Sequence, residues 1–516
     1  MYKVVQKILS ILFCLPCLLT NAQGFILETG EINKYNIPHA FTEINGFYFF
    51  NHTEMDTSID FAHSYLSKIN SNGNIINAIK LDSVRLISVF SKDNFLFAMG
   101  GKLLKNTPLP KEFSTVFYKI DSDLQIIATF ELYTPTQVHI PYDFMSYNTD
   151  TLIYAGWKFD SVNMSTDYDL CLLLDNSLQP LFIDSFPHVS FDKDISLPKL
   201  LHIPSSKYLY ITGLNNIDYN PPFFDTLIYY SFAVPIKKDD FTIQSTDTIL
   251  FQENLSGFQT EWFASLPRHA LIYDDSTSLL SVHTNGTYPN NQDYSNMGII
   301  MLNGNLKANK MLQYPFYHAS ISKMPAYYNS LDISNDGKIL YAGTYNCDNM
   351  YGICINNNRN IKICVVKTDT NGTIIWQKII GGDSVDYYVT CMKTTLDGGV
   401  LIGVMTKDTS LFNYNQKDIT KALIIKLDGN GNMVFTNTLP YKNEKPMCYP
   451  NPTNTNLLLK NITDITPYSI VNINGQIVCT GIYTGEPISV QALPSGLYVL
   501  HLQKKNNAHV LRFVKE

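Results

Sequence analysis

Residues 366–378 have the sequence VKTDTNGTIIWQK, and residues 395–403 follow with TLDGGVLIG. The Asn-Gly dipeptide at 371–372 is typical of a tight hairpin turn, and the flanking residues are apolar, β-branched or aromatic, as in strands. The Asp-Gly-Gly turn at 397–399 accepts a positive φ before a strand that ends on Gly403, where another segment can approach closely. The unit therefore predicts a pair of strands followed by another strand.

Both halves of this unit recur along the chain. Copies of the first half, a strand that runs into an Asn- or Asp-containing turn, lie at 68–75, 119–124, 174–178, 301–306 and 426–432. Copies of the second half, a turn and a strand ending on glycine or an equivalent small turn, lie at 45–51, 93–100, 150–156, 205–213, 275–284 and 336–343. With 396–403 there are about seven copies, spaced by roughly 50 to 70 residues, which is a propeller-like period.

This repeat resembles that of the β-propeller domains common in secreted Bacteroidota proteins. We therefore expect an all-β fold with a β-propeller of about seven blades. The region 214–290 is degenerate, so one blade fewer or more is compatible with the sequence. A strand near Phe25–Glu28 could complete the last blade, which would remove open sheet edges. A β-sandwich or a solenoid array gives similar strand spacing and is the alternative architecture.

The C-terminal segment carries a second set of motifs. They are CYPNPT at 448–453, VNINGQ at 471–476, LPSGLYVL at 493–500 and FVKE at 513–516. Short apolar runs separated by Asn, Gly, Pro and Thr predict a compact β-sandwich module. In order and spacing these motifs resemble the type A C-terminal sorting domain of the type IX secretion system, with which Bacteroidota pass proteins across the outer membrane.

The resemblance implies seven matched positions in the tail. They are Pro450, Asn451, Pro452, Gly475, Gly496, Tyr498 and Lys515. Glu516, after the near-terminal lysine, is a small departure from the family pattern. The family's tail is usually removed outside the cell, which here implies a cut near the linker 441–447. An ordinary β-sandwich accessory domain is the alternative interpretation of the same strands.

The N-terminus predicts a Sec signal peptide. Lys3 and Lys7 precede an apolar run, 8–19, and small residues up to Ala22 favour cleavage that leaves Gln23 as the new N-terminus. The run is too short to span a bilayer, so no transmembrane anchor is expected. The expected organisation is a signal peptide (1–22), a β-propeller-like repeat domain (23–440), a linker (441–447) and a sorting domain (448–516). The expected destination is the outer cell surface or the medium, reached through the periplasm.

Composition narrows the class of partner. The chain has 516 residues, and its aromatic content of 13% favours strands. Its formal charge of −7 becomes about −9 when Lys3 and Lys7 leave with the signal peptide. Nucleic acid is not expected as a partner, because phosphate binding needs a basic face that this chain lacks.

The sequence contains no motif typical of catalysis, a metal site or a cofactor. Residues 428–432, DGNGN, begin like a calcium loop, but Leu439 occupies the position of the closing Glu; the stretch 369–372 fails in the same way at Ile380. The histidines do not cluster at ligand spacings; among them are His52, His63, His139, His188, His202, His269, His283 and His318. A propeller can gather distant residues at its centre, so this scatter does not exclude a site.

Seven cysteines remain after the predicted cleavage, and an oxidising destination permits disulfides. Cys347 and Cys354 flank a short loop and form the best candidate pair, with two free buried thiols as the alternative. An odd total shows that not all seven can pair within the chain.

Two classes of function fit these features. The first is an exported propeller that acts as a binding or scaffold module for a glycan or protein, delivered by the type IX secretion machinery. The second is a polysaccharide hydrolase or lyase with carboxylates near the propeller channel. The missing catalytic motif favours the first class, and the fold alone cannot decide between them.

Overall fold

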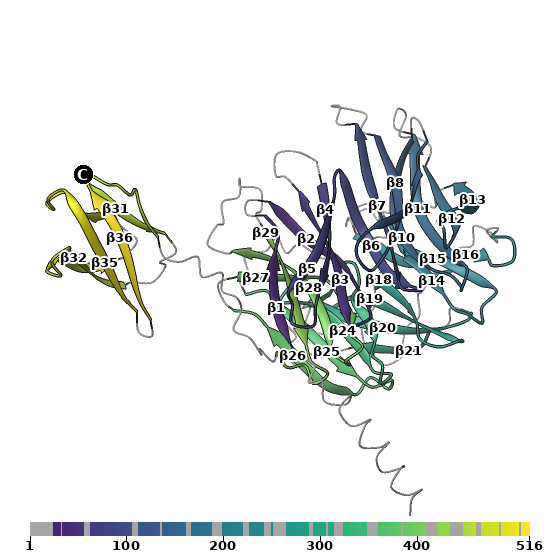
Figure 1. The fold of residues 1–516 in the computed structure, drawn as a ribbon. Coiled ribbons are helices and arrows are strands. Elements are labelled where there is room, and N and C mark those ends of the chain that lie inside the picture. Colours follow the sequence, from purple (N-terminus) through teal and green to yellow (C-terminus); the bar gives the residue numbers. More distant parts are fainter. Residues whose placement is uncertain are drawn as a thin grey trace, which may run out of the picture. The chain divides into compact units, whose positions relative to one another are not determined.

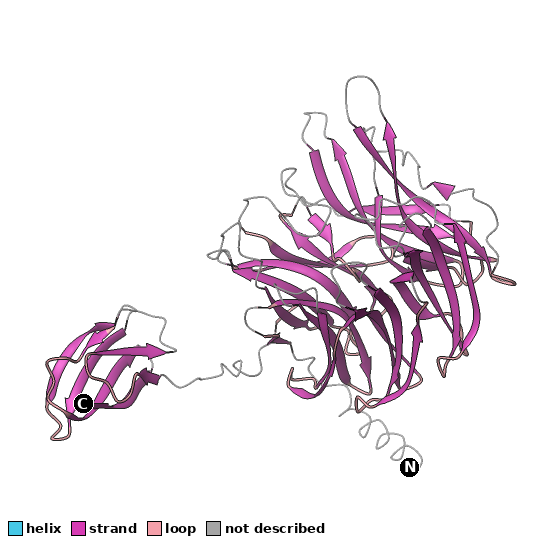
Figure 2. Cartoon of the chain, turned by 90° about the horizontal axis from the view of Figure 1, so that it is seen from above, coloured by secondary structure: helices cyan, strands magenta, loops and turns pink. Residues whose placement is uncertain are grey.

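The computed structural model describes residues 24–31, 34–55, 62–105, 112–134, 137–160, 167–187, 199–219, 226–241, 249–250, 265–287, 293–305, 308–313, 323–347, 360–382, 385–408, 420–433, 447–460, 466–483, 487–504 and 507–516. The chain divides into two compact units, Met1–Thr436 and Asn437–Glu516. Within the described ranges the regular elements are strands (Figures 1 and 2). These ranges hold no helix with the length and hydrophobicity needed to traverse a bilayer.

The first unit contains seven antiparallel sheets in its described parts. The first three are β2 (Tyr35–Ile44), β3 (Phe47–Met55), β4 (Ala62–Ile69) and β5 (Ile75–Leu81); β6 (Val84–Lys92), β7 (Phe95–Lys105), β8 (Glu112–Ile120) and β9 (Ile126–Leu132); and β10 (Gln137–Ser146), β11 (Thr151–Asp160), β12 (Asp167–Asp175) and β13 (Pro180–Pro187). The next two are β14 (Lys199–His202), β15 (Tyr208–Tyr219), β16 (Thr226–Lys237) and β17 (Ile249–Leu250); and β18 (Ser265–Ile272), β19 (Thr277–Thr287), β20 (Asp293–Asn303) and β21 (Ala308–Gln313).

The last two sheets depart slightly from this plan. The sixth has five strands, β22 (Lys323–Pro325), β23 (Leu331–Ile333), β24 (Ile339–Tyr345), β25 (Lys362–Thr368) and β26 (Ile374–Ile380). The seventh combines β27 (Val385–Thr394), β28 (Val400–Asp408) and β29 (Thr420–Leu427) with the N-terminal β1 (Phe25–Thr29). Strand β1 pairs antiparallel with β29, so a strand at Phe25 does complete the last sheet, as the sequence predicted.

Successive sheets pack face to face, and the last contacts the first. Strand β2 contacts β6, β14 contacts β18 and β24 contacts β27, while β2 also contacts β27, β28 and β29. The apolar cores lie between neighbouring sheets; one of them joins Phe49 and Leu66 of the first sheet to Leu86 and Val116 of the second. This arrangement is a β-propeller, so the predicted fold class is confirmed.

The first repeated half-motif is the hairpin between the third and fourth strands of a blade. In the sixth blade Asp369 Oδ1 accepts hydrogen bonds from the backbone N–H groups of Asn371 and Thr373, both at 2.8 Å, and Gly372 has a φ of 86°. The same two bonds, to the residues two and four positions ahead, are made by Asn70, Asp121, Asp175 and Asp428. Both stretches that begin like calcium loops are therefore turns of this kind.

The second half-motif ends on a small residue because the innermost strand approaches there. Five innermost strands among the described residues carry a β-bulge, with the register shifting at 38/40, 86/88, 141/143, 267/269 and 389/391. A Cβ atom added to Gly100 would lie 2.3 Å from the Arg85 carbonyl oxygen, and one added to Gly343 would lie 2.1 Å from that of Met324. A side chain at either glycine would displace the inner strand.

The second unit is a small two-sheet module. Its strands are β30 (Met447–Tyr449), β31 (Asn456–Lys460), β32 (Thr466–Asn472), β33 (Ile477–Tyr483), β34 (Ile488–Ser489), β35 (Gly496–Lys504) and β36 (Asn507–Lys515). One sheet has the order β33-β32-β35-β36 and the other β30-β31-β34, so neighbours are often not consecutive in sequence. The core between them includes Leu457, Ile470, Leu500 and Phe513.

Candidate functional site

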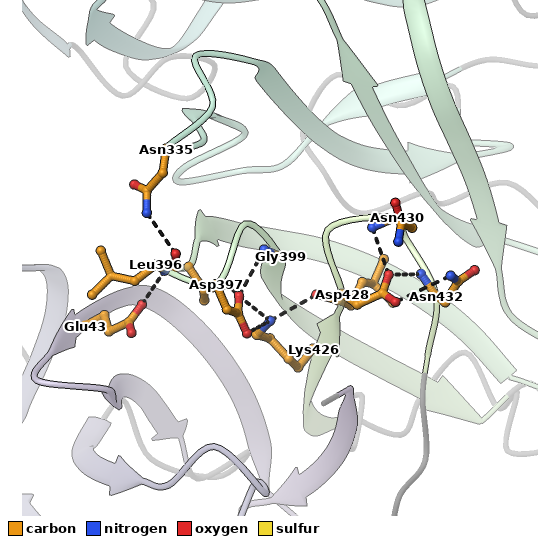
Figure 3. A network of polar contacts seen from close by, with 11 residues as sticks. Glu43, Asn335, Leu396, Asp397, Gly399, Lys426, Asp428, Asn430 and Asn432 are labelled. Carbon is orange, nitrogen blue, oxygen red and sulfur yellow. Dashed lines mark hydrogen bonds and ion pairs between the residues drawn. The ribbon is translucent and has the colours of Figure 1, made fainter. Parts of the chain in front are cut away.

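A polar network joins the last propeller blades to the first (Figure 3). The Lys426 ammonium, fully buried, lies 2.9 Å from both carboxylate oxygens of Asp397. Next to it, the backbone N–H of Leu396 donates to Glu43 Oε2 at 2.8 Å, and Asn335 Nδ2 donates to the Leu396 carbonyl at 2.8 Å. The network therefore connects the sixth, seventh and first sheets.

The two carboxylates of this network have opposite pKa shifts. Burial raises the pKa of Glu43, whereas Lys426 outweighs burial and lowers the pKa of Asp397. Such a divergence can mark an acid–base pair. Here the sixth sheet repeats the lysine–carboxylate pairing, with Lys367 Nζ 3.2 Å from Asp336 Oδ2. An ion pair that recurs at the same position of successive blades stabilises the repeat. We therefore do not take it as the functional site.

A second group of ionisable side chains lies on the innermost strands. His269 on β18 interacts electrostatically with Asp143 on β10, Lys199 on β14, Asp332 on β23 and Lys393 on β27. Burial is the main factor that lowers the pKa of His269; Lys199 adds to the effect, and Asp143 and Asp332 oppose it. Five successive blades thus each bring one charged or titratable group towards the centre.

The carboxylates of this central group are engaged by protein donors. Asp332 Oδ2 lies 2.9 Å from Lys393 Nζ and accepts hydrogen bonds from the Thr394 N–H at 2.8 Å and its hydroxyl at 2.6 Å. Asp143 Oδ2 accepts from the Leu200 N–H at 3.0 Å. Burial would raise the pKa of Asp332, but Lys393 and Thr394 lower it below its usual value. This carboxylate is ionised at neutral pH and is a poor general acid.

A third polar group crosses the centre from the second to the sixth blade. Arg85 on β6 donates from Nη2 to the Tyr328 hydroxyl at 2.9 Å. The Tyr328 ring lies 4.4 Å from the imidazole of His39, measured between ring centroids. Burial, together with Arg85 and His52, holds the pKa of His39 well below its usual value, so this imidazole is neutral.

No sequence motif singles out Arg85, Tyr328 or His39. A usable signal was an apolar residue followed by proline, which precedes the bulge of an innermost strand at 37–38, 140–141 and 266–267 and ends the innermost strand at 324–325. Proline has no N–H to donate, so in sheets it favours edges and bulges, and innermost strands offer both. Recognising this dipeptide would have marked four of the innermost strands, including those at His39 and next to Tyr328, but not β6, which carries Arg85.

The predicted sorting residues converge on the last strand of the C-terminal unit. Asn451, between Pro450 and Pro452, donates from Nδ2 to the Arg512 carbonyl at 3.0 Å and accepts from the Val514 N–H at 2.9 Å. Gly496 is opposite Lys515 in the β35–β36 ladder, and the Tyr498 ring stacks on Phe513 with centroids 5.5 Å apart. Gly475 is separate from these, in the β32–β33 turn with a φ of 79°.

The remaining predicted residues have different outcomes. Ala22, Gln23 and Cys354 lie outside the described residues. Cys347 is disulfide-bonded, and Cys171, Cys364, Cys391, Cys448 and Cys479 are free. The pairing of Cys347 with Cys354 stays a prediction. Among the described residues no group of three His, Cys, Asp or Glu side chains is placed to hold a metal ion.

The C-terminal unit has a recognisable family. Residues 447–516 match the family described as the secretion system C-terminal sorting domain. The tail is a type IX sorting domain. The protein is therefore a cargo of the type IX secretion machinery, secreted or held at the outer cell surface.

The solved structures that are similar to this chain share little of its sequence. No curated protein matches the sequence. Similar solved structures include the β-propeller domain of the Trilobed protease from Pyrococcus furiosus, at 8% identity and a TM-score of 0.41, with 79% of this chain and 100% of that chain covered. An α-L-arabinanase of Penicillium chrysogenum has 14% identity and a TM-score of 0.40, with 69% and 99% covered. PorZ, a surface component of the type IX secretion system of Porphyromonas gingivalis, has 8% identity and a TM-score of 0.23, with 92% and 75% covered.

Proposed function

We propose that the propeller is a binding module that the sorting domain delivers to the cell surface or the medium. The observation that carries this proposal is that protein donors engage the central carboxylates and keep Asp332 ionised. Asp332 is held ionised by Lys393 and Thr394, and Asp143 is an acceptor for the neighbouring blade. A glycoside hydrolase needs one carboxyl group with a raised pKa beside a second carboxylate. The described residues at the centre are cations, tyrosines, histidines and carboxylates with protein donors, and they do not form such a carboxyl pair.

The organisation of the chain supports the same proposal. We propose a signal peptide at 1–22 with cleavage between Ala22 and Gln23, a propeller at 23–440, a linker at 441–447 and a sorting domain at 448–516, in a protein of Bacteroidota type. Within the sorting domain we propose that one group of residues forms the surface that the type IX machinery recognises: Pro450, Asn451, Pro452, Gly496, Tyr498 and Lys515. Gly475 would contribute only by allowing the β32–β33 turn.

The test is to separate binding from cleavage. The mature chain, purified from the medium or released from the surface, is incubated with a panel of neutral and acidic polysaccharides. Retention is measured by affinity electrophoresis, and new reducing ends and unsaturated products are assayed in the same samples. We expect retardation by at least one glycan without product formation. Release of reducing ends or unsaturated products in step with protein concentration would instead support the hydrolase or lyase.

A further inference from the structure

We propose that Arg85, at the centre of the propeller, binds the carboxylate of an acidic sugar. The inference rests on the proposed binding function and names its ligand class. Arg85 is exposed although it lies on β6, the innermost strand of its sheet. An exposed residue on an innermost strand faces space that is open to water, so the guanidinium is accessible to a small ligand.

The charge of Arg85 has no counter-charge in the described parts of the chain. Three buried or half-buried lysines elsewhere in the propeller pair with carboxylates: Lys102 with Glu131 at 2.7 Å, Lys393 with Asp332 at 2.9 Å and Lys426 with Asp397 at 2.9 Å. Arg85 instead makes a hydrogen bond with the neutral Tyr328 hydroxyl. A guanidinium has five N–H donors in a planar fork, so most of its donors stay available for a ligand.

The backbone that carries Tyr328 is held by two hydrogen bonds. The backbone N–H of Tyr328 donates to the Thr390 carbonyl at 2.7 Å, and the N–H of Met392 donates to the Asn329 carbonyl at 2.7 Å. The segment around Tyr328 is thereby attached to β27, the innermost strand of the next sheet. Arg85 therefore has a defined position, which a binding site requires.

His39 provides a second and independent observation at the same place. Its imidazole is fully buried, and neither ring nitrogen has a hydrogen-bond partner among the described residues. Leaving such a buried group unpaired destabilises the folded chain unless a ligand or water pairs with it. Since Arg85 influences the pKa of His39 and Tyr328 contacts its ring, the unpaired imidazole lies beside the guanidinium. The Arg85 guanidinium and the His39 imidazole thus both have hydrogen-bonding groups that no described residue of the protein occupies.

The surroundings favour a sugar acid over a bare anion. Tyr35, Tyr327 and Tyr328 all interact electrostatically with Arg85, and the rings of Tyr327 and Tyr328 meet edge to face at 4.9 Å. Tyrosines combine a flat apolar face with a hydroxyl, which suits a pyranose ring. A planar carboxylate accepts two parallel, charge-assisted hydrogen bonds from a guanidinium, and the hydroxyl groups of a neutral sugar carry no charge to strengthen such bonds. The site therefore fits a uronic or other carboxylated sugar.

The test compares each acid with its uncharged ester. Galacturonate, glucuronate and mannuronate trisaccharides and N-acetylneuraminate are titrated calorimetrically into the mature chain, each beside its methyl ester. We expect at least one acid to bind about tenfold more tightly than its ester. Equal affinities for acid and ester, or no binding by any of the four acids, would overturn the assignment of Arg85. Binding of neutral glycans in that case would leave the proposed binding function intact.

Substitutions locate the effect. Arg85→Met should remove the preference for the acid, and Arg85→Lys should reduce it, because a lysine lacks the planar fork. Arg512→Met, in the sorting domain, is the matched control and should bind like the natural chain. If Arg85→Met fails to fold, Arg85→Lys and Tyr328→Phe decide: Tyr328→Phe keeps the ring and the charge of Arg85 but removes the hydroxyl that holds the guanidinium, so it should weaken the preference for the acid. An unchanged preference in a folded Arg85→Met or Arg85→Lys chain would refute the site.

Discussion

The propeller blades and the sorting domain use the same hairpin turn in different topologies. Asn472 Oδ1 in the sorting domain accepts hydrogen bonds from the N–H groups of Asn474 and Gln476, as Asp369 does from Asn371 and Thr373 in the sixth blade. Beyond the turn the two regions diverge. Most blades pair strands that are consecutive in sequence, whereas the sorting domain pairs β32 with β35, and β33 and β34 lie between them in sequence. The turn is a local property, and the topology is decided by which apolar faces can be buried together.

The two regions also place their polar residues differently. The propeller buries lysines such as Lys426, and histidines such as His39 and His139, within its interior. The hydrophobic core of the sorting domain consists of apolar and aromatic residues with two cysteines, and Thr453, Thr466 and Lys515 are also buried, whereas the motif residue Asn451 is exposed beside β36. We therefore expect function in the propeller inside the ring of sheets, where its titratable groups gather, and recognition of the sorting domain to begin at the exposed Asn451.

Removing the sorting domain should have the largest effect. A chain truncated before Met447 should fold its propeller and stay in the periplasm, because it lacks the sorting domain, which spans 447–516. Immunoblots of periplasm, cell surface and medium measure the distribution. The full-length chain with Lys421→Met, a change in an exposed ion pair, is the control and should be exported normally. Surface delivery of the truncated chain would refute the claim that export depends on the sorting domain.

Acid should distinguish the two regions next. Burial is the main factor that lowers the pKa of His139 and His202 to about 4, and it lowers that of His269 as well. The unfolded chain binds these protons near pH 6.5, so stability is complete above that pH and falls as the pH decreases towards 4. We expect a loss of roughly 1 to 2 kcal/mol per buried histidine by pH 5. Denaturant titrations at pH 7.5 and 5 measure it.

The matching control for this prediction is His139→Gln. It should flatten the pH dependence of propeller unfolding, whereas the isolated transition of the sorting domain should not respond to the substitution. A propeller that is as stable at pH 5 as at pH 7.5 would show that these histidines are not kept neutral by the fold.

A buried lysine should matter more than an exposed one. Lys426→Met leaves Asp397 without its cation and should cost the propeller about 3 to 5 kcal/mol of unfolding free energy. Lys421→Met breaks the exposed pair with Glu28, whose atoms are 2.7 Å apart, and should cost at most about 1 kcal/mol. Chemical denaturation of both variants gives the difference. Equal losses of unfolding free energy in the two variants would mean that the polar network in Figure 3 does not stabilise the propeller.

The repeats made the propeller predictable from the sequence, but the contacts at its centre could not be predicted. Each turn and each strand ending in glycine is a local signal, so the seven copies at 45–51 through 396–403 matched second strands of the sheets. Arg85 and Tyr328 are 243 residues apart and meet only because the sheets form a circular array. Nothing near either residue indicates the other. The sorting motif was found by family resemblance, although local patterns could not predict that Asn451 contacts the last strand.

Glycine substitutions should give the smallest and most discriminating effects. Gly343→Ala places a Cβ 2.1 Å from the Met324 carbonyl oxygen, so the inner strand must shift, at a cost of about 1 to 3 kcal/mol. Gly382→Ala, with no atom within 4 Å, is the propeller control and should change the free energy of unfolding by less than about 0.5 kcal/mol.

Gly496→Ala carries the same comparison into the sorting domain. Its nearest neighbour would be Tyr498 at 3.9 Å, an ordinary contact, so we expect the domain to keep its stability. If the variant is nevertheless exported less efficiently, the glycine serves recognition by the machinery, since the fold does not require it. Denaturation and export are measured on the same variant. A destabilised Gly496→Ala domain would instead place this glycine with Gly343, as a residue that the packing demands.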